Sequence, residues 1–128
     1  MPIKRLSTPA EVFAQIDSTI AAQGNALFVC FGSEDPVSGE SWCPDCVTAD
    51  PVLRSACASL RSDVVLYECP VGERSAWKNQ PTHPYRIHPL LRISRIPTLV
   101  FIENGVERGR IVEGDCAQPT VVAAFLSR

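Results

Sequence analysis

The chain has 128 residues, 45% of them hydrophobic, which is enough for one domain with one hydrophobic core but leaves no room for a second. Its 12 Lys and Arg residues and 14 Asp and Glu residues are spread along the sequence without blocks, so no strong electrostatic field would gather nucleic acid or an anionic membrane. We therefore expect a single domain over residues 1–128 that has neither of these partners.

The sequence begins with a pattern typical of a helix followed by a strand. Thr8 and Pro9 supply a hydroxyl cap and a first-turn proline, and apolar residues then recur at helical spacing, which predicts a helix over residues 8–22. A short, near-continuous apolar run predicts a strand over residues 26–31 that is covered on both faces and therefore lies centrally in its sheet.

A second helix is expected after a loop over residues 33–41. Apolar positions from Cys43 onward follow a spacing of three or four up to about Arg61, so one face of this helix should be buried. Pro51 lies inside this pattern and should kink the helix, because proline donates no backbone hydrogen bond.

The middle of the chain predicts a strand over residues 64–67, followed by a polar crossover that contains prolines. The crossover spans residues 70–93, and one helix is expected in it, over about 84–92.

The last third of the chain predicts an antiparallel hairpin and a terminal helix. Strands over 98–102 and 106–112 are separated by a turn that contains Asn104 and Gly105, and Asn-Gly is the strongest short hairpin signal. Apolar residues from Val121 to Leu126 then predict the helix. The whole order predicts an α/β protein with a central mixed β-sheet flanked by helices on both faces, in which parallel pairing precedes the C-terminal antiparallel hairpin and helix.

The six cysteines bear on the cellular compartment. They could form a disulfide framework, but Glu11 and Gln15 interrupt the first hydrophobic segment, so no signal peptide is visible. No run approaches the roughly 18 apolar residues of a membrane span. We expect a cytoplasmic protein whose cysteines are mostly thiols.

Two of these cysteines, Cys43 and Cys46, are separated by two residues at the start of a predicted helix. Their sulfurs would be close enough to bridge, so the pair can cycle between dithiol and disulfide. Unpaired N–H groups and the helix dipole should stabilise a thiolate at Cys43, whereas Cys46 lies one turn inward and should be less accessible. We therefore expect Cys43 to attack a substrate disulfide and Cys46 to resolve the mixed disulfide.

Three neighbouring residues, Trp42, Pro44 and Asp45, are expected to tune this pair. Trp42 would shield one side of it. The charge of Asp45 opposes thiolate formation, although the helix dipole favours a carboxylate in the first turn. Because repulsion would destabilise the dithiol relative to the disulfide, we expect a reducing enzyme, nearer the roughly −270 mV of thioredoxin than the oxidant DsbA.

Further motifs accompany the cysteine pair. Three features together resemble those of the thioredoxin fold: residues 42–46, the helix proline Pro51 and the segment Ile96-Pro97-Thr98. A larger set of residues resembles the thioredoxin-domain-containing protein 17 family of thioredoxin-related proteins, and the similarity covers nearly the whole chain: Ser41, Val47, Asp50, Cys69, Val71, Gly72, Glu73, Arg74, Trp77 and Lys78.

This resemblance implies a cytoplasmic disulfide reductase that is reset by NADPH-dependent thioredoxin reductase and acts on cystine, persulfides or selected disulfide-containing proteins. It also implies that Pro97 is cis and faces the cysteines, and that the backbone of Ile96 pairs with an extended substrate. We expect a monomer with no cofactor and no metal.

The sequence departs from ordinary thioredoxins in two ways. Cys30 stands in the strand before the motif, where thioredoxins usually keep a buried Asp for proton transfer. The segments 33–41 and 70–91 are also longer than in thioredoxins, and the resemblance implies that both border the cysteines. They should narrow the range of proteins that can dock.

Simpler interpretations stand beside the redox hypothesis. The cysteine pair could be half of a zinc site with His83 and His88, but the separation fits no common zinc finger, and these histidines are most simply solvated. Trp77 and Lys78 could line a substrate groove or merely cap the crossover.

The remaining cysteines have mostly structural interpretations. Cys30 and Cys57 fall on apolar faces and are most simply core residues, and Cys69 should be buried at a strand end with a supporting role left open. Cys116 precedes the last helix, where exposure would make it the best candidate for adventitious oxidation or intermolecular bridging, but a structurally neutral cysteine is the simpler interpretation.

Two other functions compete with the reductase. The chain could be a redox-sensing interaction module that binds a signalling partner. An oxidase or isomerase of secreted proteins lacks support, because no export signal is visible.

Overall fold

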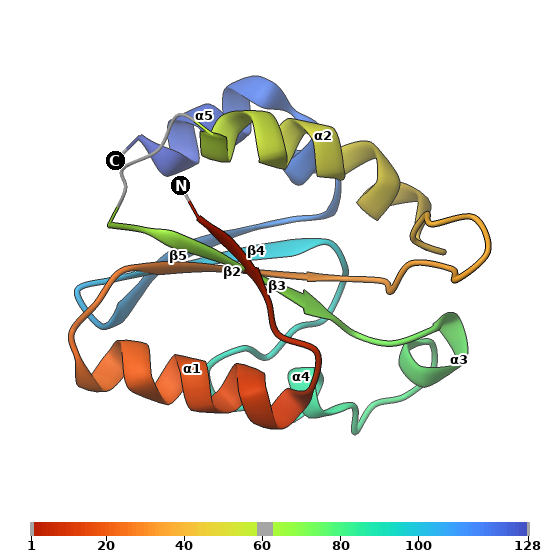
Figure 1. Cartoon of the computed structure of the whole chain (residues 1–128), viewed down its shortest axis with the longest axis horizontal. Helices are drawn as coiled ribbons and strands as arrows, with labels where there is room; N and C mark the ends of the chain where they lie inside the picture. Colours follow the sequence, from red (N-terminus) through yellow and green to blue (C-terminus); the bar gives the residue numbers. More distant parts are fainter. Residues whose placement is uncertain (1, 59–62, 128) are drawn as a thin grey trace.

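A computed structural model of the chain describes residues 2–58 and 63–127, which form a sheet between two layers of helices (Figure 1). The strands are β1 (Ile3–Arg5), β2 (Ala26–Phe31), β3 (Val65–Pro70), β4 (Thr98–Glu103) and β5 (Val106–Val112). The helices are α1 (Pro9–Ala21), α2 (Pro44–Ala58), α3 (Arg74–Trp77), α4 (Pro84–Ile87) and α5 (Pro119–Leu126), with a 3-10 turn η1 (Glu113–Ala117) before α5.

The five strands lie in the order β1-β3-β2-β4-β5. β1 and β2 both pair with β3 in parallel, whereas β4 pairs antiparallel with β2 and with β5. The predicted α/β architecture, a mixed sheet with a C-terminal antiparallel hairpin and helix, is therefore confirmed. Among the described residues, no helix is both long and apolar enough to cross a membrane.

Each face of the sheet is covered by its own helices, because side chains alternate along the central strand β2. Phe28 and Cys30 pack in a cluster that includes residues of α1 and α4, while Leu27 and Val29 pack with residues of α2 and α5. Figure 1 shows α2 and α5 above the sheet and α1 and α4 below it. The start of α2 and the C-terminal ends of β2 and β3 lie at one end of the sheet, where the predicted site is located.

Local sequence signals located most of these elements. Thr8 caps α1 as predicted, and its hydroxyl accepts a hydrogen bond from the Glu11 amide at 3.2 Å. Asn104 and Gly105 have φ values of +54° and +80°, as a tight hairpin turn between β4 and β5 requires. Pro51 lies inside α2. The predicted end of this helix near Arg61 lies outside the described residues.

The edge strand and the crossover differ from prediction. β1 was not predicted, because its three residues are exposed and form no apolar pattern. β3 runs on to Pro70 rather than ending at residue 67. The helix expected over 84–92 is only the short α4, because His88 precedes Pro89 and is held in an extended conformation. α3 and η1 were also not predicted.

Candidate active site

Cys43 and Cys46 lie at the start of α2, with Pro44 as the first helical residue. All six cysteines are free thiols, and the Cys46 thiol donates to the Cys43 sulfur at 2.6 Å. Each of these two residues is only 5% exposed to solvent. The sequence predicts that Cys46 is the less accessible of the two, and the structure shows no such difference. The difference between them lies in their hydrogen bonds.

Hydrogen bonds to its sulfur make Cys43 the more acidic thiol. The Cys46 amide donates to this sulfur at 3.3 Å, as expected at a helix N-terminus. The Cys46 thiol contributes most to lowering the pKa of Cys43 to about 7, against burial and the charge of Asp45, which raise it. The expected opposition of Asp45 is therefore present but is outweighed.

The Cys46 thiol has the opposite character. The Cys43 sulfur and burial hold the pKa of Cys46 far above its ordinary value, so Cys46 stays protonated while Cys43 ionises. Above about pH 7 the pair therefore supplies one thiolate and one thiol, the arrangement that thiol–disulfide exchange requires of an attacking and a resolving cysteine.

The segment before β4 lies against the pair. The Ile96–Pro97 peptide bond is cis, as the resemblance implied, and the Ile96 carbonyl lies 3.9 Å from the Cys43 sulfur. Ile96 and Pro97 are therefore brought to the cysteines from a distant part of the sequence.

Trp42 directly precedes the pair and is fixed in place by contacts with two glycines. Its indole N–H donates to the Gly72 carbonyl at 2.8 Å, which ties the segment before α2 to the end of β3. Its ring lies against Gly32, where a Cβ atom would come within 2.7 Å of the ring. Trp42 also packs against the hydrophobic cluster that contains both cysteines, so these three residues belong to one packed unit.

Ser41 was not identified as a site residue from the sequence, although it lies beside the cysteines. Its hydroxyl donates to the Gly32 carbonyl at 2.6 Å and accepts from the Cys43 amide at 3.1 Å. A hydroxyl two residues before a cysteine at a helix start is a capping pattern that could have revealed it.

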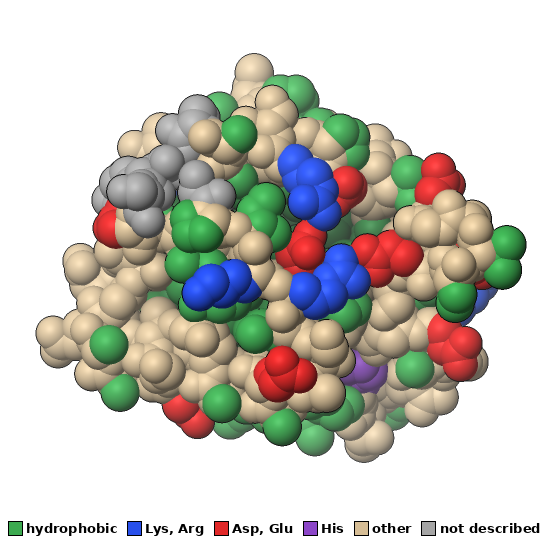
Figure 2. All heavy atoms as spheres, viewed as in Figure 1, with side chains coloured by type: hydrophobic (Ala, Val, Ile, Leu, Met, Phe, Trp, Pro, Cys, Tyr) green, Lys and Arg blue, Asp and Glu red, His purple; other side chains and the backbone are tan. Residues whose placement is uncertain are grey.

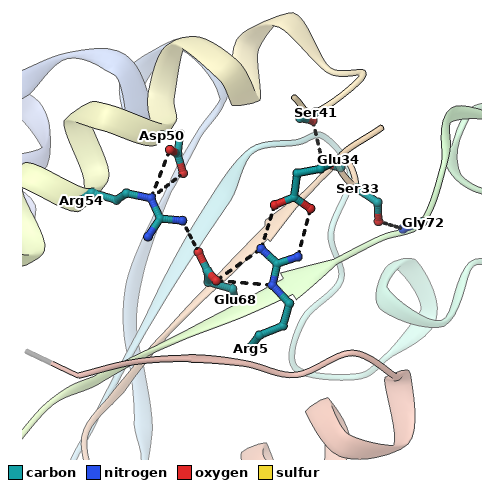
Figure 3. A network of polar contacts seen from close by, with 9 residues as sticks. Arg5, Ser33, Glu34, Ser41, Asp50, Arg54, Glu68 and Gly72 are labelled. Atoms are coloured by element: carbon teal, nitrogen blue, oxygen red, sulfur yellow. Dashed lines mark hydrogen bonds and ion pairs between the residues drawn. The ribbon is translucent and has the colours of Figure 1, made fainter. Parts of the chain in front are cut away.

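A network of charged side chains joins the neighbouring segments (Figure 3). Arg5 donates to both carboxylate oxygens of Glu34, at 2.9 and 2.8 Å, and more weakly to Glu68. Arg54 donates to Glu68 at 2.6 Å and to Asp50 at 3.1 Å. On this face of the molecule, basic and acidic side chains gather around a hollow (Figure 2). The network joins β1, the loop 33–41, β3 and α2.

This network borders a cleft of about 340 Å³ between α2 and the loop 33–41. Glu34 and Glu68 line it together with Ser41 and Cys46, so it connects the Cys46 thiol with polar groups. A second groove, of about 790 Å³, lies on the other side of the loop, next to Trp42, and Lys78 lines it.

Several sequence expectations about the surroundings are corrected. Cys116 is fully buried rather than exposed, because η1 turns its sulfur toward the carbonyls of Ile111 and Pro97. His83 is buried and hydrogen-bonded to the Val71 carbonyl. His88 is half-buried and caps the Leu90 and Leu91 amides, so neither histidine is simply solvated.

The other cysteines and Trp77 lie in the core. Cys30 and Cys69 are register partners on β2 and β3, and both are fully buried, as is Cys57. Trp77 is buried under the guanidinium of Arg86, whose carbon lies 3.6 Å from the ring centre. Within residues 2–58 and 63–127, no group of three His, Cys, Asp or Glu side chains could hold a metal ion.

Comparisons with known proteins give a family match over most of the chain. Residues 9–128 match the family described as "Thioredoxin domain-containing protein 17-like, thioredoxin domain". The chain is 33% identical over 116 residues to thioredoxin domain-containing protein 17 of Mus musculus, a match that covers 90% of this chain and 89% of that protein. It is 34% identical over 114 residues to the thioredoxin-like protein Clot of Oryza sativa subsp. japonica, covering 82% of this chain and 81% of that protein.

The solved structures agree on the fold. Thioredoxin O2 from Arabidopsis thaliana, in its oxidized state, is similar with a TM-score of 0.69 at 21% sequence identity, covering 98% of this chain and 95% of that chain. This likeness confirms the thioredoxin fold that the sequence motifs predicted.

Proposed function

The chain belongs to the thioredoxin domain-containing protein 17-like family of thioredoxin domains, and from that premise we propose that it is a disulfide reductase that uses Cys43 and Cys46. The observation that carries the proposal is a pair of free thiols 2.6 Å apart at the start of α2, in which the Cys43 sulfur accepts hydrogen bonds from the amide and the thiol of Cys46. The pKa of Cys43 is lowered to about 7 by the Cys46 thiol, and that of Cys46 is raised by the Cys43 sulfur. Cys43 is the nucleophile and Cys46 is the resolving cysteine.

The reaction has two exchange steps. In the first, the Cys43 thiolate attacks one sulfur of the substrate disulfide, a bond forms between Cys43 and that sulfur, and the other substrate sulfur leaves as a thiolate. In the second, Cys46 gives up its proton and attacks the Cys43 sulfur, and the remaining substrate sulfur leaves and takes up a proton. Two electrons pass to the substrate, and the Cys43–Cys46 disulfide must then be reduced.

The electron donor we propose is NADPH-dependent thioredoxin reductase, acting on a monomeric protein in the cytoplasm. The substrates are cystine, persulfides or selected disulfide-containing proteins. An extended substrate segment would pair with the backbone of Ile96, which lies beside the Cys43 sulfur, in the way that strands pair at a sheet edge.

The test is NADPH oxidation by thioredoxin reductase with this protein and a panel of small and protein disulfides. Wild type should turn over at least one of these substrates. Cys43→Ser should retain no more than a few per cent of that rate, because a hydroxyl is not ionised near neutral pH. Turnover by Cys43→Ser, or none by freshly prepared wild type, would reject the proposal.

A second candidate is a redox-sensing interaction module. The observation that favours it is the groove of about 790 Å³ beside Trp42, which is lined by charged side chains of the loop 33–41 and of α3 and is large enough to dock a protein segment. A variant with both Cys43 and Cys46 changed to Ser separates the two hypotheses. Full cellular activity of that variant would favour the module over the reductase.

A further inference from the structure

The hydroxyl of Ser41 is held in a fixed position between the Gly32 carbonyl and the Cys43 amide. It accepts from the Cys43 amide at 3.1 Å, and its own hydrogen points to the Gly32 carbonyl at 2.6 Å. The backbone of Ser41 is held as well, because Ser41 pairs with Glu34 in an isolated antiparallel bridge. The oxygen is therefore anchored, while its hydrogen can rotate about the Cβ–Oγ bond.

The same hydroxyl lies close to the cysteine pair: it binds the amide of Cys43, whose sulfur is 2.6 Å from that of Cys46, and Ser41 and Cys46 line one cleft. The Cys43 sulfur and burial raise the pKa of Cys46, and the Gly32 amide and the Ser41 hydroxyl oppose them. These two opposing groups are neutral hydrogen-bond donors.

The balance at Cys46 changes during the reaction. Once Cys43 has attacked, its sulfur is part of a mixed disulfide and carries no charge, so the largest effect that keeps Cys46 protonated is removed. The groups that remain around the Cys46 sulfur then determine how easily it ionises. Ser41 and Cys46 both line the cleft of about 340 Å³, through which solvent can accept the proton.

Resting on the proposed reductase function, we propose that Ser41 is a positioning residue for the resolving step. Its O–H turns from the Gly32 carbonyl to the Cys46 sulfur and stabilises the thiolate that displaces the substrate. The proton of Cys46 leaves through the cleft and is balanced by the proton that the departing substrate thiolate takes up. The rotation of this one hydrogen is the movement that the step needs, since the Ser41 oxygen is anchored at the cleft that Cys46 also lines.

A chromogenic aromatic disulfide separates the two steps in a single turnover without any reductase. The first aromatic thiolate is released when Cys43 attacks, and the second is released when Cys46 resolves the mixed disulfide. Ser41→Ala should slow the second release about tenfold and change the first by less than about threefold, because a hydrogen bond to a charged sulfur is lost only in the second step. Ser41→Thr, which keeps the hydroxyl, should restore the second release.

Two controls distinguish this role from a structural one. Ser38→Ala removes another hydroxyl of the same loop, one that accepts from the Glu40 amide, and should leave both releases unchanged. The pair Ser41→Thr and Ser41→Val has the same shape with and without a hydroxyl, which keeps the test valid if the alanine variant does not fold.

The outcomes are distinct. No release of thiolate by wild type would refute the reductase function itself. Two normal releases by wild type, with equal slowing of both by Ser41→Ala or Ser41→Val, would show that Ser41 only supports the fold. An unchanged second release in both of these variants would likewise overturn the assignment of Ser41.

Discussion

The indole ring of Trp42 lies against Gly32 so closely that a Cβ atom on residue 32 would come within 2.7 Å of the ring and 3.0 Å of the Ser41 hydroxyl. Gly32→Ala must therefore displace one of these side chains, and we expect it to lower the free energy of unfolding by about 1–3 kcal/mol. Urea unfolding followed by tryptophan fluorescence measures this change.

Gly114→Ala is the matched control, because nothing lies within 4 Å of the added atom there. Its stability should stay within about 1 kcal/mol of wild type. Equal stability of the two variants would mean that Trp42 moves aside freely, and the packed unit described above would be wrong.

Cys46→Ser should accumulate a mixed disulfide with substrate, because Cys43 can still attack but nothing displaces the bound sulfur. On a non-reducing gel the adduct should account for most of the protein within one turnover time and disappear with added dithiol. Cys43→Ser is the control and should form no such adduct. If instead Cys43→Ser forms the adduct and Cys46→Ser does not, the order of the two cysteines is reversed.

Asp45→Asn should lower the pKa of Cys43, because it removes a charge that raises this pKa and retains the shape of the side chain. In wild type, the rate of alkylation of Cys43 should rise with pH through about 7, since the thiolate is the reactive form. The variant's curve should be displaced to lower pH, with alkylation about threefold faster on the acidic side.

The same change should make the protein less reducing, because stabilising the thiolate stabilises the dithiol relative to the disulfide. Redox equilibration against glutathione at one ionic strength measures this. Asp17→Asn, on α1, is the control and should alter neither quantity. A raised or unchanged pKa of Cys43 in Asp45→Asn would contradict the electrostatic explanation.

Glu68→Gln should destabilise the protein by about 1–3 kcal/mol, because the Glu68 side chain is only 12% exposed and accepts from both Arg5 and Arg54. Asp50→Asn breaks a pair with the same Arg54, but Asp50 is 58% exposed and its effect should be below about 1 kcal/mol. Thermal unfolding of both variants at two salt concentrations compares them. A larger loss of stability in Asp50→Asn than in Glu68→Gln would contradict the importance assigned to the ion pairs of Glu68.

The elements that could be predicted from the sequence are those with local causes. Thr8 and Pro9 cap their own helix, and Asn104 and Gly105 form their own turn, so short windows of sequence determine α1 and the hairpin. β1 has no such cause. It exists because Ile3 pairs with Leu66 on β3, a partner that no short window contains.

The site likewise combines features that follow from local sequence with features that depend on distant residues. Cys43 and Cys46 stand in one motif, so their proximity follows from their spacing, and cis Pro97 was expected from a resemblance rather than from local physics. Arg5 and Glu68 are 63 residues apart, and their contact depends on the completed sheet. The burial of Cys116 could not be predicted for a similar reason, because only the fold shows that η1 turns it inward.

The four cysteines outside the motif are buried, and their burial limits how readily their thiols are oxidised. Cys30, Cys57, Cys69 and Cys116 all have no exposed surface. Burial raises the pKa of Cys57 to about 11 and that of Cys116 to about 12, so these thiols rarely form the species that peroxides attack. In the proposed reductase cycle, oxidation is therefore directed to Cys43 and Cys46, and the four buried thiols are kept out of disulfide exchange.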